Sequence, residues 1–164
     1  MRQMNRLPYV QMIEVKRWAD RGLCDTLDRD LARLGEAEAG LMLRVLDHIH
    51  AVDRIFQAHL LGRPHAYRAA RSEVLPTFET LARDMAEVDD WYAEHVTALP
   101  PRAFDQPVDF VFTSGKPARL KRGEIVQHVC LHGAYHRGNA GALLQLRGLT
   151  PSRDSITDYL EAAA

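Results

Sequence analysis

The sequence predicts an all-α protein, a four-helix bundle interrupted by one non-helical stretch before the last long helix. Four long segments carry apolar residues at helical spacing, and three of them end at glycine or proline. The composition, with 46% hydrophobic and 26% charged residues, is that of an ordinary globular chain. A chain of 164 residues has the size of one domain, 1–164, and buries a core without disulfides or a structural metal.

Helical segments are predicted at Tyr9–Asp28, Glu36–Leu61, Thr77–Leu99, Arg122–Arg147 and Ser155–Glu161. Pro8 stands just before the first segment, and proline suits the first turn of a helix because its fixed φ matches the helix. The second segment stops at Gly62-Arg63-Pro64, a combination that ends helices.

The later segments carry similar signals. The third stops at Pro100-Pro101, and the fourth stops at Gly148 with Pro151 just beyond. The short last segment has Asp154 or Ser155 as its N-cap, since both side chains can accept a hydrogen bond from a free backbone N–H. These local signals predict where each helix begins and ends.

The stretch PVDFVFTSGKPARLKRG separates the third and fourth segments. Val108, Phe110 and Phe112 alternate with polar or smaller residues, and Ser114-Gly115 supplies a turn. A small β-hairpin and an irregular ordered loop are equally compatible with this pattern.

Charge and apolar patterning exclude several classes of protein. The formal net charge is −1, which gives no general electrostatic reason to bind nucleic acid. The stretch MRQMNRLPYVQMIEVKRW interleaves charged and apolar residues, unlike a signal peptide, and no apolar run is long enough to cross a membrane. Cys24 and Cys130 form no C-x-x-C pair and are expected to be reduced thiols. A cytoplasmic protein with no membrane or nucleic-acid partner is expected.

Histidines of the second segment differ in their predicted orientation. On a helical wheel at about 100° per residue, His48 falls within the apolar stripe that contains Leu41 and Val52. His50 falls about 200° away among charged residues, so it is expected to be solvated. His59 shares the face of His48 but lies about 16 Å further along the axis, too far to share an ion with it.

The fourth segment places three histidines at intervals of four residues. Its predicted inner stripe consists of Ile125, His128, Val129, His132, His136, Asn139, Leu143 and Leu146. Histidines four residues apart can bind one metal ion, but His128 and His136 are about 12 Å apart along the axis. The spacing therefore leaves two pairs open, His128 with His132 and His132 with His136.

Two explanations fit buried histidines. Eight histidines give roughly 0.4 H-x-x-x-H pairs by chance, and a lone core histidine is more often a hydrogen-bonded structural residue. A divalent ion would satisfy several imidazoles at once and offset the cost of burying them. There is no H-E-x-x-H motif and no pair of E-x-x-H motifs, so a metalloprotease and a di-iron carboxylate protein are disfavoured. Three neutral imidazoles would suit Zn, Ni or Fe and leave coordination positions open.

Several motifs together resemble one family. The segment HVCLHGAYHRGNAGALLQLRG resembles the signature helix of the DinB/YfiT-like metalloenzymes, which carries N-H-x-x-x-H-R-G-Q. LDHIHAVDRIF is similar to their L-N-H-x-x-x-x-D-R-x-W motif, KRWADRGLCDTL to their W-A-N-x-x-L segment, and TPSRDSITDYL to their usual ending. The resemblance spans almost the whole chain in the right order.

The resemblance implies a site and a fold. It makes His48, His132 and His136 the metal ligands, and it leaves His128 one turn before the site without binding the ion. It also implies a four-helix bundle with a long crossover between the second and third helices, and a homodimer. Asn139, Leu131 and Asp20 replace the family's usual Gln, Asn and Asn, changes that leave the three histidines intact.

Other residues have simpler expected roles. Asp53 and Arg54 match the family's D-R pair. Asp53 either orients a ligand or caps a neighbouring group, or, as the favoured alternative, belongs to a solvated or salt-bridged pair on the flank of the helix. Tyr135 could donate a hydrogen bond to a metal-bound group, but packing against neighbouring side chains is the favoured role. Small residues are dense on the fourth segment and are expected to permit close helix approach within the bundle or across a dimer interface, at Gly133, Gly138, Ala140, Gly141 and Ala142.

The predicted function is a metal-dependent enzyme acting on a small electrophilic molecule. Some relatives use low-molecular-weight thiols as transferases or isomerases, so thiol-dependent transfer is expected by resemblance, with hydrolysis as a further possibility. No catalytic nucleophile or base stands out beside the histidines. The alternatives are a non-catalytic metal-binding stress-response protein, and a structural helical dimer whose histidines are satisfied by water.

Overall fold

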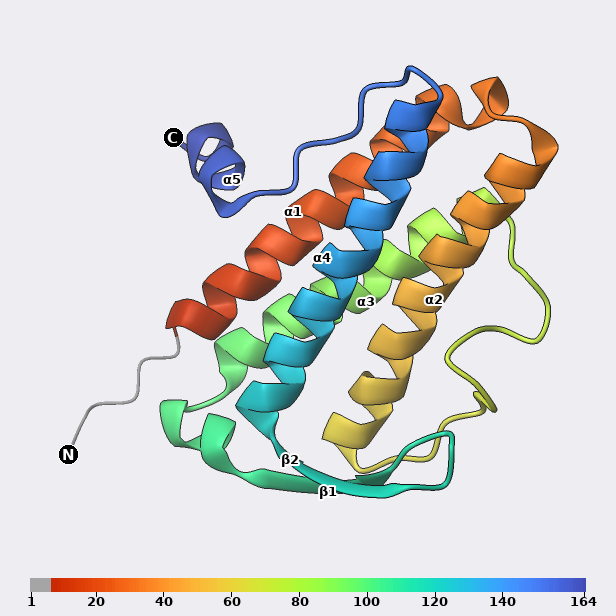
Figure 1. The fold of residues 1–164 in the computed structure, drawn as a ribbon. Helices are drawn as coiled ribbons and strands as arrows, with labels where there is room; N and C mark the ends of the chain where they lie inside the picture. Colours follow the sequence, from red (N-terminus) through yellow and green to blue (C-terminus); the bar gives the residue numbers. More distant parts are fainter. Residues whose placement is uncertain (1–6) are drawn as a thin grey trace.

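Four long helices lie side by side and form most of the molecule (Figure 1). The computed structural model describes residues 7–164. The prediction that the N-terminal stretch is not a signal peptide falls in part on Met1–Arg6, which lie outside the described residues. The elements in chain order are α1 (Leu7–Asp30), η1 (Leu31–Arg33), α2 (Glu36–Leu61), α3 (Phe78–Ala98), η2 (Pro101–Asp105), β1 (Pro107–Val111), β2 (Pro117–Lys121), α4 (Arg122–Leu146) and α5 (Ile156–Ala162).

The predicted helices are confirmed, each boundary within about two residues of its expected position. Local chemistry explains the agreement. Gly62 ends α2 in the left-handed conformation that glycine adopts without strain, and Thr77 caps α3 by accepting a hydrogen bond from the Thr80 N–H. Ser155 caps α5 in the same way. Within residues 7–164, no helix combines the length and the apolar character that a bilayer crossing requires.

The long helices pack in pairs. α1 packs against α3 and α4, and α2 packs against the same two helices. Residues 62–77, which we call the crossover segment, leave the end of α2 and return along its side to the start of α3 (Figure 1). This long return allows α2 and α3 to run in the same direction.

The stretch before α4 is a hairpin, which decides between the two structures considered for it. β1 and β2 pair antiparallel, with Val108 opposite Leu120 and Phe110 opposite Ala118. Val108 and Phe110 are buried, as their alternation predicts, but Phe112 lies beyond the end of β1 and is exposed. The turn contains Gly115 with φ 85°, a conformation that favours glycine.

The interior consists of two hydrophobic clusters with a charged layer between them. One cluster includes Ile13 of α1 and Val88 of α3, and the other includes Leu23 of α1 and Met85 of α3. Lys16 lies between these clusters and is almost completely buried. Buried charges are costly unless they are paired, so the neighbours of Lys16 determine whether this layer is stable.

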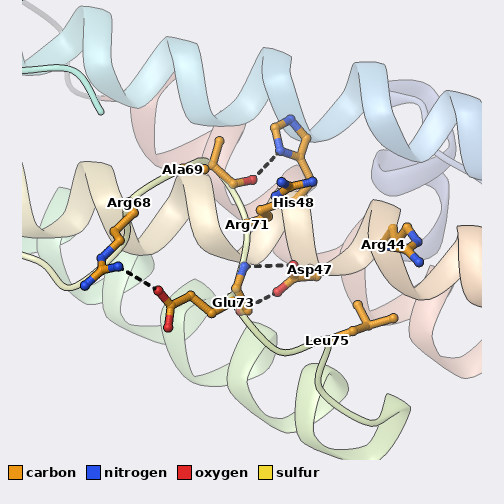
Figure 2. Close-up of a pocket in the computed structure, with 10 residues that line it drawn as sticks. Arg44, Asp47, His48, Arg68, Ala69, Arg71, Glu73 and Leu75 are labelled. Carbon is orange, nitrogen blue, oxygen red and sulfur yellow. Dashed lines mark hydrogen bonds and ion pairs between the residues drawn. The ribbon is translucent and has the colours of Figure 1, made fainter. Parts of the chain in front are cut away.

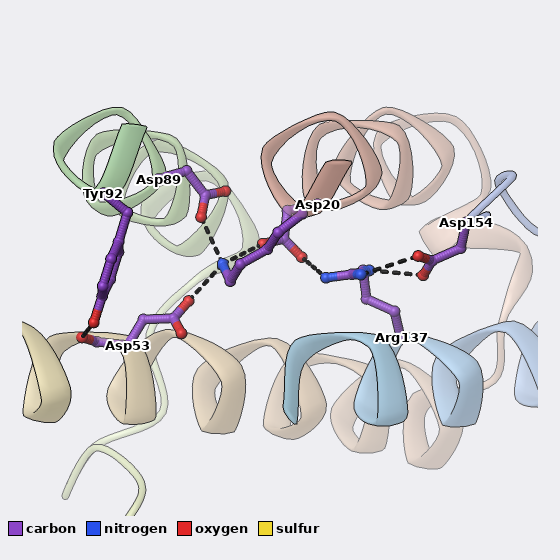
Figure 3. A network of polar contacts seen from close by, with 7 residues as sticks. Asp20, Asp53, Asp89, Tyr92, Arg137 and Asp154 are labelled. Atoms are coloured by element: carbon purple, nitrogen blue, oxygen red, sulfur yellow. Dashed lines mark hydrogen bonds and ion pairs between the residues drawn. The ribbon is translucent and has the colours of Figure 1, made fainter. Parts of the chain in front are cut away.

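Three aspartates from three helices surround the Lys16 ammonium (Figure 3). Its Nζ lies 2.6 Å from Asp20 Oδ2 on α1, 2.8 Å from Asp53 Oδ2 on α2 and 2.5 Å from Asp89 Oδ1 on α3. Arg137 of α4 extends the network, with Nη1 2.8 Å from Asp20 Oδ1. All four long helices are therefore joined by one ionic cluster.

The expectation that Asp53 lies on a helix flank is wrong. Asp53 is fully buried, whereas its neighbour Arg54 turns outward to Glu87, at 3.0 Å. Asp53 follows Ile49 by four residues and precedes Phe56 by three, so it belongs to the same buried face as those two core residues. A wheel centred on Leu41, which is exposed, places that face incorrectly.

The cluster holds more negative than positive groups, and its pKa values reflect this. Burial alone would lower the pKa of Lys16, but the attraction of the surrounding aspartates outweighs it and the pKa lies well above the usual value. Burial raises the pKa of Asp53 to about 6, against the opposing attraction of Lys16. Burial also raises the pKa of Asp89 well above its usual value. Asp53 and Asp89 therefore take up a proton at a higher pH than exposed carboxylates do, whereas the attraction of Lys16 and Arg137 outweighs burial at Asp20 and lowers its pKa.

Replacing Lys16 with methionine should strongly destabilise the protein. The Lys16→Met variant leaves three buried carboxylates without their cation, which we expect to cost about 3–5 kcal/mol of unfolding free energy at pH 7. The loss should shrink as the pH falls, because protonation removes the uncompensated negative charge. Urea unfolding monitored by circular dichroism measures both effects.

The control for this experiment is Lys116→Met, the same change at an exposed lysine in the hairpin turn. It should alter stability by no more than about 0.5 kcal/mol. Equal unfolding free energies for the two variants would contradict the role given to Lys16.

Candidate metal centre

Three histidines from two helices meet beside the interface of α2 and α4. His48 comes from the middle of α2, and His132 and His136 come from successive turns of α4. One ring nitrogen from each lies within 4.8 Å of the others, and His48 Nε2 is 3.0 Å from His132 Nε2. Of the open pairs on α4, the structure brings His132 and His136 to His48. His128 is exposed and outside this group, although its ring lies near that of His132, with centroids 5.6 Å apart.

A backbone carbonyl fixes the orientation of His48. Its Nδ1 lies 2.7 Å from the carbonyl oxygen of Ala70 in the crossover segment. A carbonyl can only accept a hydrogen bond, so Nδ1 carries a proton and Nε2 is the ring nitrogen left to face other groups. Nε2 is the atom that faces His132. This arrangement of a backbone acceptor behind a histidine is typical of metal ligands.

The site favours neutral imidazoles, the form that binds metal ions. Burial lowers the pKa of His132 to about 3, and repulsion from His136 and His48 contributes further. Burial, followed by repulsion from His48, also lowers the pKa of His136. His132 Nδ1 is buried without a hydrogen-bond partner. His132 and His136 are therefore held in the neutral form at pH 7.

The geometry fits a shared divalent ion. Two nitrogens that each lie about 2.1 Å from one ion are about 3.0–3.4 Å apart at the angles of octahedral and tetrahedral coordination. The 3.0 Å separation of His48 Nε2 and His132 Nε2 agrees with this range. Among residues 7–164 the group includes no carboxylate and no cysteine. Three protein nitrogens would leave coordination positions open for other ligands.

On α4, His132 and His136 lie at the edge of the buried face and not in its centre, where the wheel placed them. Asn139 and Leu146, assigned to the inner stripe, are exposed, Leu146 to 82%. The side chains and glycines that α4 buries are Gly123, Ile125, Val126, Val129, Cys130, Gly133, Arg137, Ala140 and Leu144. α4 packs against α1 as well as α2, and this second contact turns its buried face away from the histidines. The site is consequently half-exposed.

The expectation that His50 is solvated is wrong. Its exposed fraction is only 6%, and its Nε2 accepts a hydrogen bond from Arg54 Nε at 3.2 Å. α2 contacts α3, α4 and the crossover segment, so a face that is polar in the sequence is also covered. His59 lies far along α2, stacked on Phe110 with ring centroids 4.4 Å apart.

Tyr135 does not have the packing role expected of it. It is 69% exposed, with its ring at an edge-to-face distance of 5.0 Å from that of His136. Leu131, one turn before it, is also exposed. The outer surface of α4 next to the site therefore carries large apolar groups.

A cavity of about 490 Å³ lies beside His48, between α2 and the crossover segment (Figure 2). Its lining residues are Arg44, Asp47, His48, Arg68, Ala69, Ala70, Arg71, Ser72, Glu73 and Leu75. No sequence pattern indicates this cavity, because it forms only where the crossover segment folds back onto α2.

The helical fold and the three converging histidines agree with what the sequence motifs imply, a helical protein with a candidate metal site. The DinB family model matches residues 1–164, the whole chain. The chain belongs to the DinB family. No curated protein and no solved structure matches the chain.

The low pKa of His132 predicts how the stability of the metal-free protein changes with pH. An unfolded imidazole takes up a proton near pH 6.5, whereas folded His132 does so only near pH 3, so stability falls as the pH drops through this window. In the His132→Gln variant, the unfolding free energy should change less steeply with pH than in the wild type. The difference in slope should be less than about 1.4 kcal/mol per pH unit, because a half-exposed group is partly screened by solvent. Urea unfolding between pH 7 and pH 4 in the presence of a chelator measures it, and parallel curves would contradict the prediction.

Proposed function

We propose that this protein is a metal-dependent member of the DinB family, in which His48, His132 and His136 bind one divalent ion within a four-helix bundle. The observation that carries the proposal is the convergence of three ring nitrogens from two helices within 4.8 Å. The Ala70 carbonyl supports it by directing His48 Nε2 toward α4. Zn, Ni and Fe are the candidate ions, because all three accept imidazole ligands.

The proposed activity is that of an enzyme acting on small electrophilic molecules, by thiol-dependent transfer or by hydrolysis. The ion supplies Lewis acidity and lowers the pKa of a water or thiol ligand. The chain's own cysteines are unsuited to the reaction, because burial raises the pKa of both Cys24 and Cys130 to about 12. The nucleophile therefore comes from outside the chain, as water or as a low-molecular-weight thiol. The cavity beside His48 has room for the substrate of such a reaction.

Metal content tests the ligand assignment. Protein purified without a histidine tag should hold one divalent ion per chain, and the His132→Ala variant should hold almost none, because two imidazoles bind far more weakly than three. Elemental analysis after gel filtration measures the stoichiometry. Binding should weaken in acid as protons compete for the ligands, at a lower pH than for free imidazole since the pKa values of His132 and His136 are lowered.

His128→Ala is the matched control. It removes a histidine from the same helix, one turn before His132, but from a position outside the group of three. It should retain the ion. His50 is less suitable, because it is buried and its loss would disturb the packing of α2. Equal metal content in the wild type and the His132→Ala variant would refute the proposal, and an ion without turnover of thiols and electrophiles would favour a non-catalytic metal-binding protein.

We also propose that the protein is a cytoplasmic homodimer that associates through the outer surface of α4. Leu131, Tyr135 and Leu146 are exposed there, and Gly138 has open space around it, so a second helix could approach closely. Leu131→Arg places a charge in this surface and should convert a dimer to a monomer without loss of helicity. Light scattering at tens of micromolar checks this, and a monomeric wild type would contradict it.

A further inference from the structure

The crossover segment is fastened to α2 on both sides of Arg71. On one side, the Ala70 carbonyl accepts the hydrogen bond from His48 Nδ1, at 2.7 Å. On the other side, Ser72 donates to Asp47 twice, from its backbone N–H at 3.0 Å and from its hydroxyl at 2.6 Å. Two adjacent residues of α2 thus hold the residues before and after Arg71. The backbone of Arg71 is fixed beside a proposed metal ligand, although most of the crossover segment has no regular structure.

The cavity next to this anchor carries unbalanced positive charge. Arg44, Arg68 and Arg71 line it (Figure 2). Arg68 pairs with Glu73, with Nη1 3.5 Å from Oε1, and both Asp47 oxygens accept hydrogen bonds from Ser72. In the part of the chain that the structure describes, neither Arg44 nor Arg71 has an acidic side chain within ion-pair distance. The chain as a whole has a net charge of only −1, so the positive character is local.

We infer that this cavity binds the anionic group, a carboxylate or a phosphate, of a small molecule, with Arg71 and Arg44 as its main contacts. Guanidinium groups present planar pairs of N–H donors that match both kinds of anion. The volume of about 490 Å³ is within the range of small-molecule sites. Fixing the backbone of Arg71 in advance reduces the entropy lost when the anion binds.

The position of the cavity gives this anion a place in the proposed reaction. Arg44 precedes His48 by one turn of α2, about 6 Å along the axis, and the His48 ring forms a wall shared by the cavity and the histidine group. A molecule anchored by its anion would therefore lie next to the metal centre. The substrate or thiol cosubstrate is accordingly a small acidic molecule. This last step rests on the proposed function, whereas anion binding itself does not require the ion.

Titrations of the metal-free protein test the inference. Inorganic phosphate and succinate are added separately to chelator-treated protein and followed by changes in NMR amide signals, so that the phosphate and carboxylate sources are distinguished. At least one anion should bind saturably and shift signals of the crossover segment. The double variant Arg44→Gln/Arg71→Gln should bind it about tenfold more weakly, because two charge-assisted contacts are lost. Binding should also weaken as sodium chloride is added.

Arg119→Gln is the matched control, because it removes an exposed arginine of β2 that does not line the cavity. It should bind the anion as the wild type does. The double variant should fold as the wild type does, because both replaced arginines are exposed. Circular dichroism checks this. The inference is overturned if neither anion saturates the wild type by tens of millimolar, or if the double variant binds as tightly as the control.

The metal-binding variant separates this inference from the proposed function. His132 does not line the cavity, so the His132→Ala variant should bind the anion normally in the absence of metal. Anion binding without metal binding in the wild type would leave the inference standing and defeat the proposed function. Metal binding without anion binding would defeat the inference alone.

Discussion

The Lys16 ammonium is the group on which the arrangement of the helices depends. It is buried between two hydrophobic clusters, where an unpaired charge would cost several kcal/mol. Its partners, Asp20, Asp53 and Asp89, come from three different helices, so α1, α2 and α3 have to meet at one height. Hydrophobic contacts favour burial without specifying direction, whereas these ion pairs require the aspartates of three helices to lie around one ammonium.

The same cluster positions the candidate metal centre. On α2, Asp53 follows His48 by five residues and pairs with Lys16. On α4, Arg137 directly follows His136 and pairs with Asp20. Fixing these two residues fixes the height of α2 relative to α4, and with it the meeting of the histidines. Gly133 makes room for this contact, because a Cβ at that position would lie 2.9 Å from Arg137 Nη1.

The crossover segment also constrains the candidate metal centre, through its hydrogen bonds to α2. Its Ala70 carbonyl fixes the proton of His48 on Nδ1, and Ser72, two residues further along the chain, is held by Asp47. One anchored stretch of backbone therefore orients the proposed metal ligand His48 and also holds Arg71 at the cavity. Because the ionic cluster and the crossover segment approach α2 from different sides, His48 is constrained from both.

The helices, their ends and the spacing of the histidines could be predicted from local sequence patterns. Gly62, Thr77 and Ser155 act within one turn of their own positions, and the separation of His132 from His136 follows from the pitch of a helix. The family motifs selected the same three histidines that the structure brings together.

Which face of each helix is buried depends instead on the packing of the whole chain. A helical wheel assumes one apolar contact face, but α2 is enclosed by two helices and the crossover segment, so His50 and Asp53 are buried despite their polarity. The ionic cluster and the arginine-lined cavity join residues far apart in the chain. No local pattern encodes such contacts, because they depend on how separate elements are placed in space.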